Sequence, residues 1–273
     1  MDATIINDTF PTEIQPKDIK IPLKMHQLAL LKQCRILEDS SCKPIKLINE
    51  GQNKRCELKS KFGIIGDIVG SGKTLSILAI ISNKKILENR LPKMIHKGLV
   101  TCHEYSLEDY NVLPYNIIVV PHTIFKQWKE TIEDCTDLKY FGINNKKSLV
   151  EFEKAFINGT NTPKLDADII LIASTRYSEF DYLIRDFPYN FSRYFFDEAD
   201  ILKINSYATV NSSFIWFVSS SYKSLLNPDA TNVWLNSSGE SSPIYNYDHY
   251  IRKSVGGLKN SGYIKNILTN IRE

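Results

Sequence analysis

Residues 66–74 read GDIVGSGKT, and this stretch decides the fold because it joins an apolar run to a helical segment through a glycine-rich loop. The preceding run FGII (62–65) is typical of a buried strand. Gly70 and Gly72 let the backbone curl, so that successive N–H groups point toward one anion. The stretch therefore predicts a strand, a phosphate-binding P-loop and a helix, in that order.

Lys73 and Thr74 open the predicted helix, which continues as LSILAII (75–81). The lysine supplies a mobile positive charge, the threonine hydroxyl is placed to bind Mg²⁺, and the helix N-terminus adds its partial charge. Asp67 stands where the strict pattern G-x-x-x-x-G-K-S/T has its first glycine. The alternative is a fortuitous glycine turn, which would not require the surrounding strand and helix.

The second decisive stretch is YFFDEAD (194–200), an aromatic strand that runs into three carboxylates within four residues. If this strand lies beside the P-loop strand, Asp197 can hold Mg²⁺ through water and Glu198 can orient the water that attacks a phosphate. The alternative is a helix N-terminus enriched in acids, which suit the helix dipole. The P-loop upstream favours the metal site, because the two motifs complete such a site together.

Composition indicates a soluble globular protein. The chain has 273 residues, of which 42% are hydrophobic, enough for one large or two small domains. Its net charge of +3 comes from 34 basic and 31 acidic residues, so any nucleic-acid surface would be local. An odd number of cysteines without C-x-x-C predicts reduced thiols in an intracellular protein. Neither a signal peptide nor an apolar run of membrane-spanning length is evident, so no membrane contact is expected.

From residue 62 onward, short apolar runs alternate with helical patterns, which predicts an α/β fold. Runs that are apolar on both faces suit strands buried in a parallel sheet, whose ligands gather at the carboxyl ends of the strands. The expected strands are 62–65, 116–120, 138–141, 168–173, 193–196 and 214–218, and the expected helices are 23–37, 73–90, 123–135, 147–157 and 176–186.

The predicted domain division has three parts. Residues 1–60 form an N-terminal extension, with a weakly ordered lead-in over the first twenty residues and a linker at 38–60. Residues 61–222 form the nucleotide-binding domain, with surface excursions at 91–113 and 157–165. Residues 223–273 form a helical C-terminal extension, with one or two helices in 243–273.

Six ordered motifs resemble the first RecA-like domain of superfamily 2 helicases and translocases. They are LKMHQ (23–27), GIIGDIVGSGKT (63–74), IIVVPHTIFKQW (117–128), DIILIASTRY (168–177), FFDEAD (195–200) and FIWFVSSS (214–221). The nearest resemblance is to Swi/Snf-type ATPases and to helicase-like transcription ATPases of large DNA viruses, over roughly residues 20–222. It implies a RecA-like P-loop domain with a mostly parallel, helix-flanked sheet that binds ATP and Mg²⁺.

The resemblance and the P-loop pattern together give the expected nucleotide site. Its members are Gln27, Asp67, Gly70, Ser71, Gly72, Lys73 and Thr74. Gln27 resembles the glutamine that reads the adenine edge, where an amide can both donate and accept; a solvated helix residue is the alternative. Thr74 and Asp197 are the expected metal ligands, and Lys73 and Glu198 are the expected catalytic residues.

Two motifs resemble segments that contact nucleic-acid phosphates. They supply Pro121 and Thr123 from the first segment, and Ser174, Thr175 and Arg176 from the second. An ordinary helix N-cap explains the hydroxyls of Ser174 and Thr175 nearly as well. Trp128 also lies in the first segment, and we expect its indole to pack in the core.

A last motif resembles the serine/threonine segment that couples hydrolysis to domain movement. Ser219, Ser220 and Ser221 form it, and they would act through Asp200, the last acid of DEAD. The chain departs from Swi/Snf-type enzymes here, because they usually end the acidic motif in His and carry Ser-Ala-Thr or Gly-Thr-Pro in place of the triple Ser. Residues 222–273 contain no recognisable arginine motif of a second RecA-like domain, so that domain is an expected partner, in cis or in trans.

The sequence thus predicts the ATP-binding half of a nucleic-acid-dependent ATPase, acting on DNA without sequence specificity and only weakly active alone. The expected location is the cytoplasm, the nucleus or a viral replication site. Two alternatives remain, a catalytically inactive helicase-like scaffold and a P-loop phosphotransferase. A response of ATP turnover to DNA would argue against the phosphotransferase, whereas tight ATP binding without turnover would indicate the scaffold.

Overall fold

The computed structural model describes part of the chain, and its centre is an eight-stranded sheet in which all neighbouring strands are parallel. In spatial order the strands are β1 (Thr4–Ile5), β14 (Thr269–Ile271), β4 (Phe62–Gly66), β11 (Ser212–Ser219), β10 (Asn190–Phe196), β7 (Val112–Val120), β9 (Ile169–Ala173) and β8 (Tyr140–Ile143). The described residues are 4–5, 9–40, 45–49, 54–58, 62–84, 86, 93–97, 100–104, 112–157, 165–185, 187, 189–202, 212–221, 233–235, 241–243 and 269–271.

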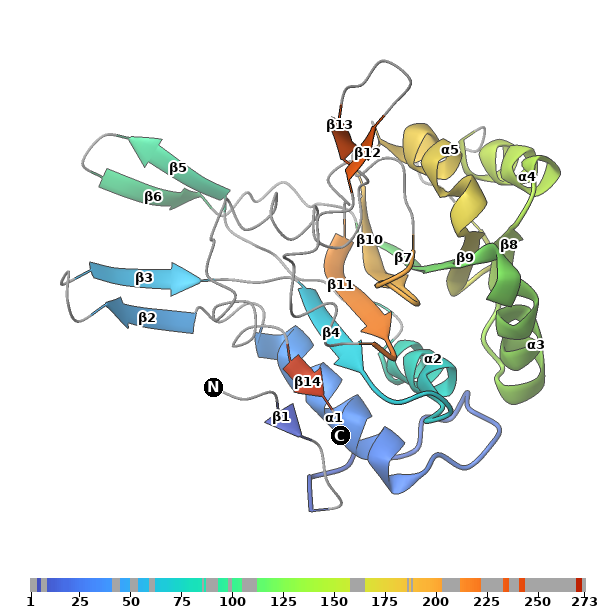
Figure 1. The fold of residues 1–273 in the computed structure, drawn as a ribbon, viewed down its shortest axis with the longest axis horizontal. Helices are drawn as coiled ribbons and strands as arrows, with labels where there is room; N and C mark the ends of the chain where they lie inside the picture. The colour runs from blue at the N-terminus through green and yellow to red at the C-terminus, as the bar shows by residue number, and fades with distance from the viewer. Residues whose placement is uncertain are drawn as a thin grey trace.

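Helices cover both faces of this sheet (Figure 1). They are α1 (Met25–Ser40), α2 (Lys73–Asn83), α3 (Phe125–Cys135), which follows the 3-10 turn η1 (His122–Ile124), α4 (Lys146–Ile157) and α5 (Ser174–Ile184). Residues of α1, α2 and α3 belong to one hydrophobic cluster, and residues of α4 and α5 belong to another. The two groups of helices therefore lie on opposite faces, as expected for an α/β fold of this type.

The strands form where the sequence is apolar on both faces. Every residue of β9 and of β11 is buried. In β7, Ile117 and Val119 join the cluster under α4 and α5, whereas Ile118 and Val120 join the cluster under α1 to α3. This alternation with a period of two is what a parallel strand covered on both sides requires.

The expected α/β architecture with a parallel, helix-flanked sheet is confirmed. The expected strands and helices of residues 62–218 are present, with shifts of one to three residues at several ends and two larger changes in extent. β7 already begins at Val112, and α2 ends at Asn83 instead of continuing to residue 90. The acidic strand β10 was assumed to lie beside the P-loop strand β4. This assumption is wrong, because β11 lies between the two strands.

Differences from the sequence-based expectations lie in the connecting stretches. Within 38–60, taken as a linker, α1 continues to Ser40 and an antiparallel hairpin of β2 (Ile45–Asn49) and β3 (Lys54–Leu58) follows. The excursion at 91–113 contains a second hairpin, of β5 (Lys93–Lys97) and β6 (Val100–Glu104). Both hairpins stand apart from the main sheet (Figure 1). Most of the expected excursion at 157–165 lies outside the described residues.

The C-terminal stretch 223–273 was expected to be helical, but its described residues are strands. β12 (Val233–Leu235) pairs with β13 (Ser241–Pro243), and β14 joins the main sheet beside β4. The apolar residues near β14 have a spacing that also fits a helix, and short apolar runs do not distinguish the two. Any helix in the rest of 223–273 falls outside the described residues.

The N-terminal lead-in is also more ordered than expected, from residue 9 onward. The backbone N–H of Glu13 donates to the carbonyl of Leu28, and Ile19 is buried against the cluster under α1 to α3. The Gln15 amide donates to the carbonyls of Ile19 and Ile21 and accepts from the N–H of Leu23. These contacts hold the segment against α1 and the hydrophobic cluster beneath it.

A buried ion pair joins α1 to the sheet. The guanidinium of Arg193 donates to both carboxylate oxygens of Glu38, across 2.7 and 2.9 Å, and both side chains are almost fully buried. The indole N–H of Trp216 donates to the same carboxylate across 2.9 Å. Arg193 also donates to the carbonyl of Lys84 and to the amide oxygen of Asn116. Two charges are therefore matched by a network that the sequence patterns did not indicate.

Candidate nucleotide site at the carboxyl edge of the sheet

The P-loop connects the end of β4 to the first turn of α2 and needs glycine at two positions. Gly70 and Gly72 have φ angles of 80° and 85°, which L side chains rarely adopt. A Cβ atom on Gly72 would also lie 2.5 Å from the amide nitrogen of Gln27. The backbone conformation therefore requires glycine at position 72, and a side chain there would also displace the Gln27 amide.

Lys73 and Asp67 shape the loop from within. The ammonium of Lys73 donates to the carbonyls of Asp67 and Ile68, each across 3.1 Å. The Asp67 carboxylate is buried and accepts from the N–H of Ile68 across 2.9 Å. This side-chain contact explains how aspartate fits where the strict pattern has glycine. The ammonium of Lys73 thus lies over the loop and faces its backbone carbonyls.

The N-terminus of α1 is bonded directly to the loop. A ring nitrogen of His26 lies 3.1 Å from the carbonyl oxygen of Ser71, and the amide of Gln27 donates to the carbonyl of Gly72 across 3.3 Å. The hydroxyl of Ser71 is buried and has no hydrogen-bond partner among the described residues. A buried hydroxyl without a partner in a glycine loop could be satisfied by an oxygen of a bound anion.

Gln27 keeps hydrogen-bonding capacity in this position. Its amide oxygen accepts from the N–H of Lys24 across 2.8 Å, and its nitrogen makes one contact, with Gly72. An amide has two N–H groups and two acceptor lone pairs, so these bonds leave one donor and one acceptor. That pair matches a base edge that both donates and accepts, such as adenine.

We expect Gln27→Ala to reduce the preference for ATP over GTP by about 1–3 kcal/mol, because a base edge that loses its partner is left unpaired. Calorimetric titration with each Mg²⁺–nucleotide measures the change. Glu13→Ala is the matched control. Glu13 pairs with Lys32 and Arg35 of α1, which lie further along the helix than Gln27 and away from the loop. An equal loss for both nucleotides would remove Gln27 from base recognition.

The acidic turn after β10 is held in an unusual backbone conformation. Glu198 has a φ angle of 50°, the only positive φ of a non-glycine residue in the part of the chain that the structure describes. The N–H of Asp197 donates to the carbonyl of Val119, and the N–H of Ala199 donates to the carbonyl of Val218. Such strain persists where neighbouring strands fix the turn, and it is common at functional sites.

Burial governs the electrostatics of the two acids. Burial raises the pKa of Asp197, an effect partly offset by hydrogen bonds from Trp128 and the backbone of Glu198 and by the charge of Lys73. Burial likewise raises the pKa of Glu198, followed by the negative charge of Asp197, and the charge of Lys73 again opposes the shift. Lys73 is therefore within electrostatic reach of both carboxylates, although β11 separates their strands.

Ser219, the last residue of β11, contacts both motifs. Its carbonyl accepts from the N–H of Asp67 across 3.4 Å, and its hydroxyl donates to the carboxylate of Asp200 across 2.5 Å. The same hydroxyl oxygen accepts from the N–H of Ser221 across 2.8 Å, and Ser220 is half-buried beside it. The serine motif and the last acid of DEAD are thus brought together, as the resemblance implied.

The residues expected to contact nucleic acid lie at the same edge. Pro121, Ser174 and Thr175 line one pocket of about 560 Å³, together with Ser178, Glu179, Ile201 and Leu202. Thr123 is exposed on η1 next to Pro121. Arg176 is half-buried and donates to the carboxylate of Glu179 across 2.9 and 3.1 Å. Two separate segments therefore meet at one concave surface.

The sequence missed two features of the site. His26 lies in LKMHQ, but only Gln27 of that motif was given a role, so the contact of His26 with the loop could be found only once α1 was placed. Trp128 packs in the core as expected, but its indole N–H also donates to the Asp197 carboxylate across 2.8 Å. Trp128 and Asp197 lie 69 positions apart, so the sequence gave no signal of this bond. Only the tertiary structure brings these side chains to the site.

The arrangement fits a Mg²⁺–nucleotide. Mg²⁺ in such sites is held by one or two protein oxygens together with substrate phosphates and water. Thr74 lies in the first turn of α2, and Asp197 lies at the end of β10 at the same edge of the sheet. No group of three or more His, Cys, Asp or Glu that could hold a metal ion occurs among the described residues.

Sequence comparison gives one clear relative. Over 160 residues the chain is 27% identical to a putative helicase of Acanthamoeba polyphaga mimivirus, a match that covers 51% of this chain and 18% of the relative. The chain resembles a viral helicase. It spans less than a fifth of that helicase, so the activity and partners of the whole relative come to this chain only as proposals. No model of a protein family matches the chain.

Solved structures with a similar course of the chain include two helicase-type proteins. The Sulfolobus solfataricus SWI2/SNF2 ATPase core domain matches 97% of this chain and 46% of its own, with 15% identity and a TM-score of 0.47. The Type ISP restriction-modification enzyme LlaGI, in a complex with a DNA substrate mimic, matches 74% of this chain and 18% of its own, with 10% identity and a TM-score of 0.46. Among the helices of this helicase-like chain that the structure describes, none is long and apolar enough to span a membrane.

Proposed function

We propose that this chain is the ATP-binding part of a nucleic-acid-dependent ATPase of the helicase or translocase type. The double contact of Ser219 is the observation that supports this most. Its carbonyl holds the P-loop through Asp67, and its hydroxyl holds the acidic turn through Asp200. A phosphate-binding loop and a turn of carboxylates are thereby linked at one edge of the sheet, as hydrolysis of a nucleoside triphosphate requires.

In this proposal each residue of the edge has a defined task. Lys73 and the N–H groups of the loop bind the phosphates, and Thr74 and Asp197 hold Mg²⁺. When bound, Mg²⁺ neutralises negative charge on the phosphates. Glu198 orients the attacking water, and the raised pKa of its carboxylate suits a group that accepts a proton. A movement of Asp200 would be transmitted to the loop through the hydrogen bonds that Ser219 makes with Asp200 and with Asp67.

A second RecA-like domain is the proposed partner in hydrolysis. Transition-state charge on the phosphates is commonly stabilised by arginine. The four arginine side chains that the structure describes pair with acids other than Asp197 and Glu198: Arg35 with Glu13, Arg176 with Glu179, Arg185 with Asp181 and Arg193 with Glu38. An arginine supplied from elsewhere, in cis or in trans, would complete the site.

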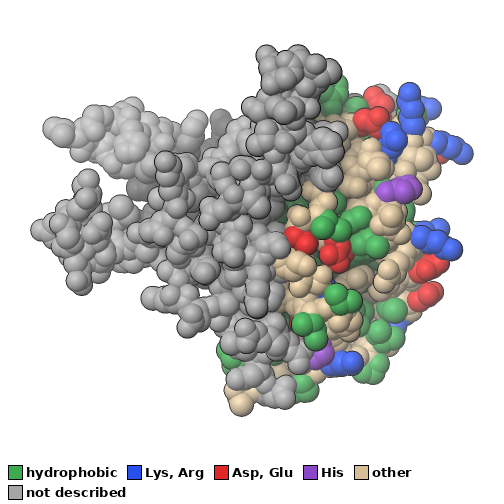
Figure 2. Space-filling model, viewed as in Figure 1, with side chains coloured by type: hydrophobic (Ala, Val, Ile, Leu, Met, Phe, Trp, Pro, Cys, Tyr) green, Lys and Arg blue, Asp and Glu red, His purple; other side chains and the backbone are tan. Residues whose placement is uncertain are grey.

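The proposed nucleic-acid surface is the pocket lined by Pro121, Ser174 and Thr175. Basic and acidic side chains are interspersed over the described part of the face that Figure 2 shows, without one large basic area. Binding should therefore depend on a few phosphate contacts and be indifferent to sequence. DNA is the proposed nucleic acid, by analogy with Swi/Snf-type enzymes.

We expect the chain to bind nucleic acid weakly, with an affinity that falls steeply as salt is raised. Arg176→Ala should weaken binding at low salt and reduce the slope of log K against log salt by about 1, because one phosphate contact is lost. Fluorescence anisotropy with labelled DNA and RNA of unrelated sequences measures both quantities and compares the two nucleic acids.

Arg185→Ala is the matched control for this prediction. Arg185 follows the same helix, pairs with Asp181 and lies over the ring of Tyr182, away from the pocket. Its loss should leave the slope unchanged. An equal change for both variants, or binding that does not respond to salt, would contradict the proposed surface and favour the scaffold alternative.

A further inference from the structure

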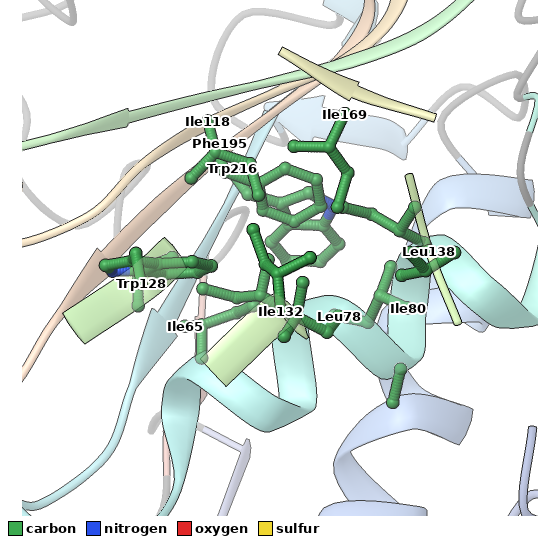
Figure 3. Packing of buried hydrophobic residues seen from close by; sticks show 14 of the residues in the cluster. Ile65, Leu78, Ile80, Ile118, Trp128, Ile132, Leu138, Ile169, Phe195 and Trp216 are labelled. Atoms are coloured by element: carbon green, nitrogen blue, oxygen red, sulfur yellow. The ribbon is translucent and has the colours of Figure 1, made fainter. Parts of the chain in front are cut away.

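The hydrogen bond between Trp128 and Asp197 at the site has not yet been given a role. The indole N–H of Trp128, in α3, donates to Oδ2 of Asp197 across 2.8 Å. Trp128 is 1% exposed and Asp197 is 5% exposed, so water does not compete for this bond. Figure 3 shows Trp128 and Ile132 of α3 beside Ile65 of β4 and Leu78 of α2 in the surrounding core.

The chemistry of the indole makes this contact directional. An indole has a single N–H donor and no acceptor, so it can satisfy only an acceptor such as a carboxylate oxygen. A bond from a buried N–H to a charged oxygen is shorter and stronger than a neutral one, and it holds Oδ2 of Asp197 in place. Any large ring at position 128 could fill this part of the core, whereas orienting the Asp197 carboxylate needs the indole N–H.

We propose that Trp128 is a positioning residue for the Mg²⁺ site, which it serves by holding the Asp197 carboxylate in the orientation that binds the metal. This inference rests on the proposed function, in which Asp197 is a metal ligand. Carboxylates that bind metals are themselves held by outer hydrogen bonds, whose removal typically costs about 10–100-fold in metal affinity. Trp128 therefore acts through Asp197 and touches neither metal nor nucleotide.

The chain contains a matched control for this role. Trp216 likewise donates its indole N–H to a buried carboxylate, that of Glu38, across 2.9 Å. It is fully buried in the same hydrophobic cluster as Trp128. Trp→Phe at either position removes one indole N–H from one buried carboxylate, but only Trp128→Phe removes it from the proposed metal ligand.

The test measures the affinity of a fluorescent ATP analogue with Mg²⁺ and with EDTA, for the unaltered chain, Trp128→Phe and Trp216→Phe. Trp128→Phe should weaken binding about 10–100-fold with Mg²⁺ and leave binding in EDTA unchanged. Trp216→Phe should change neither affinity, although its melting temperature should fall comparably. If Trp128→Phe does not fold, benzothienylalanine at position 128, which replaces the N–H by sulfur and keeps the ring volume, takes its place.

The outcomes separate the inference from the function on which it rests. Equal Mg²⁺-dependent affinity of Trp128→Phe and the unaltered chain would overturn the positioning role and leave the proposed function standing. Equal losses with Mg²⁺ and with EDTA would also overturn it, because they would indicate a general distortion of the loop. An unaltered chain that does not bind the Mg²⁺–nucleotide at all would defeat the proposed function itself.

Discussion

Replacing Lys73 with alanine is expected to weaken Mg²⁺–ATP binding by about 1.5–3 kcal/mol, which is roughly 10–150-fold in affinity. Lys73 opens α2 beside the glycine loop, and its ammonium lies over the loop carbonyls of Asp67 and Ile68. A bound phosphate would take over this charge-assisted contact, so its loss falls directly on the nucleotide. Calorimetric titration of the folded variant measures the change.

Lys84→Ala is the matched control, because Lys84 directly follows the other end of α2. Its side chain forms only a partly exposed ion pair with Asp39 at 3.7 Å, and its contact with Arg193 uses the backbone carbonyl, which alanine keeps. Nucleotide affinity should therefore be unchanged. Unaltered affinity in a folded Lys73→Ala chain would show that the glycine loop is not the phosphate site.

Replacing Arg193 with methionine is expected to lower the free energy of unfolding by about 3–5 kcal/mol, because it leaves the buried Glu38 carboxylate without its countercharge. Arg193 and Glu38 are both buried, so bulk water cannot replace the bonds that the Glu38 carboxylate loses. Urea unfolding followed by circular dichroism measures the loss. The ion pair fastens α1, whose first turn carries His26 and Gln27 against the P-loop.

The double variant Arg193→Met/Glu38→Gln tests whether the loss comes from the unpaired charge. It should cost less than the sum of the two single changes, because the neutral amide needs no countercharge and still offers an acceptor to Trp216. Lys147→Ala, which removes an exposed pair with Glu151 at 4.0 Å, should cost at most about 0.5 kcal/mol. Single and double variants that simply add would contradict the coupling.

Most of the fold could be predicted because its signals are local. The strands of the sheet core are short apolar runs, and burial on both faces makes β9 and β11 apolar throughout. The connecting hairpins could not be predicted in the same way, since β2 and β3 carry lysine and glutamate among their apolar residues. The placement of β14 beside β4 was missed because three residues are too few for a periodic pattern.

The candidate site likewise has a part that local sequence signals predicted and a part that they did not. The glycines, Lys73 and the acids of DEAD are close in sequence within each motif, and their spacing follows from the turn that each motif must form. The sequence did not reveal that β11 lies between the two motif strands, nor that Ser219 links Asp67 to Asp200. Strand order depends on how the whole chain packs, so it is not written in any one segment.

The sequence by itself determined the elements of the proposed chemistry: a glycine loop at 66–74 that would bind phosphate, an acidic turn at 197–200 and an alternating α/β framework that places both at the carboxyl ends of strands. Only the tertiary structure decided which side chains support them. Trp128 meets Asp197 across 69 positions of the chain, and Glu38 meets Arg193 across 155. Such partners are chosen by burial, because a buried polar group must be matched by whichever side chain the packing brings within reach, however distant in sequence.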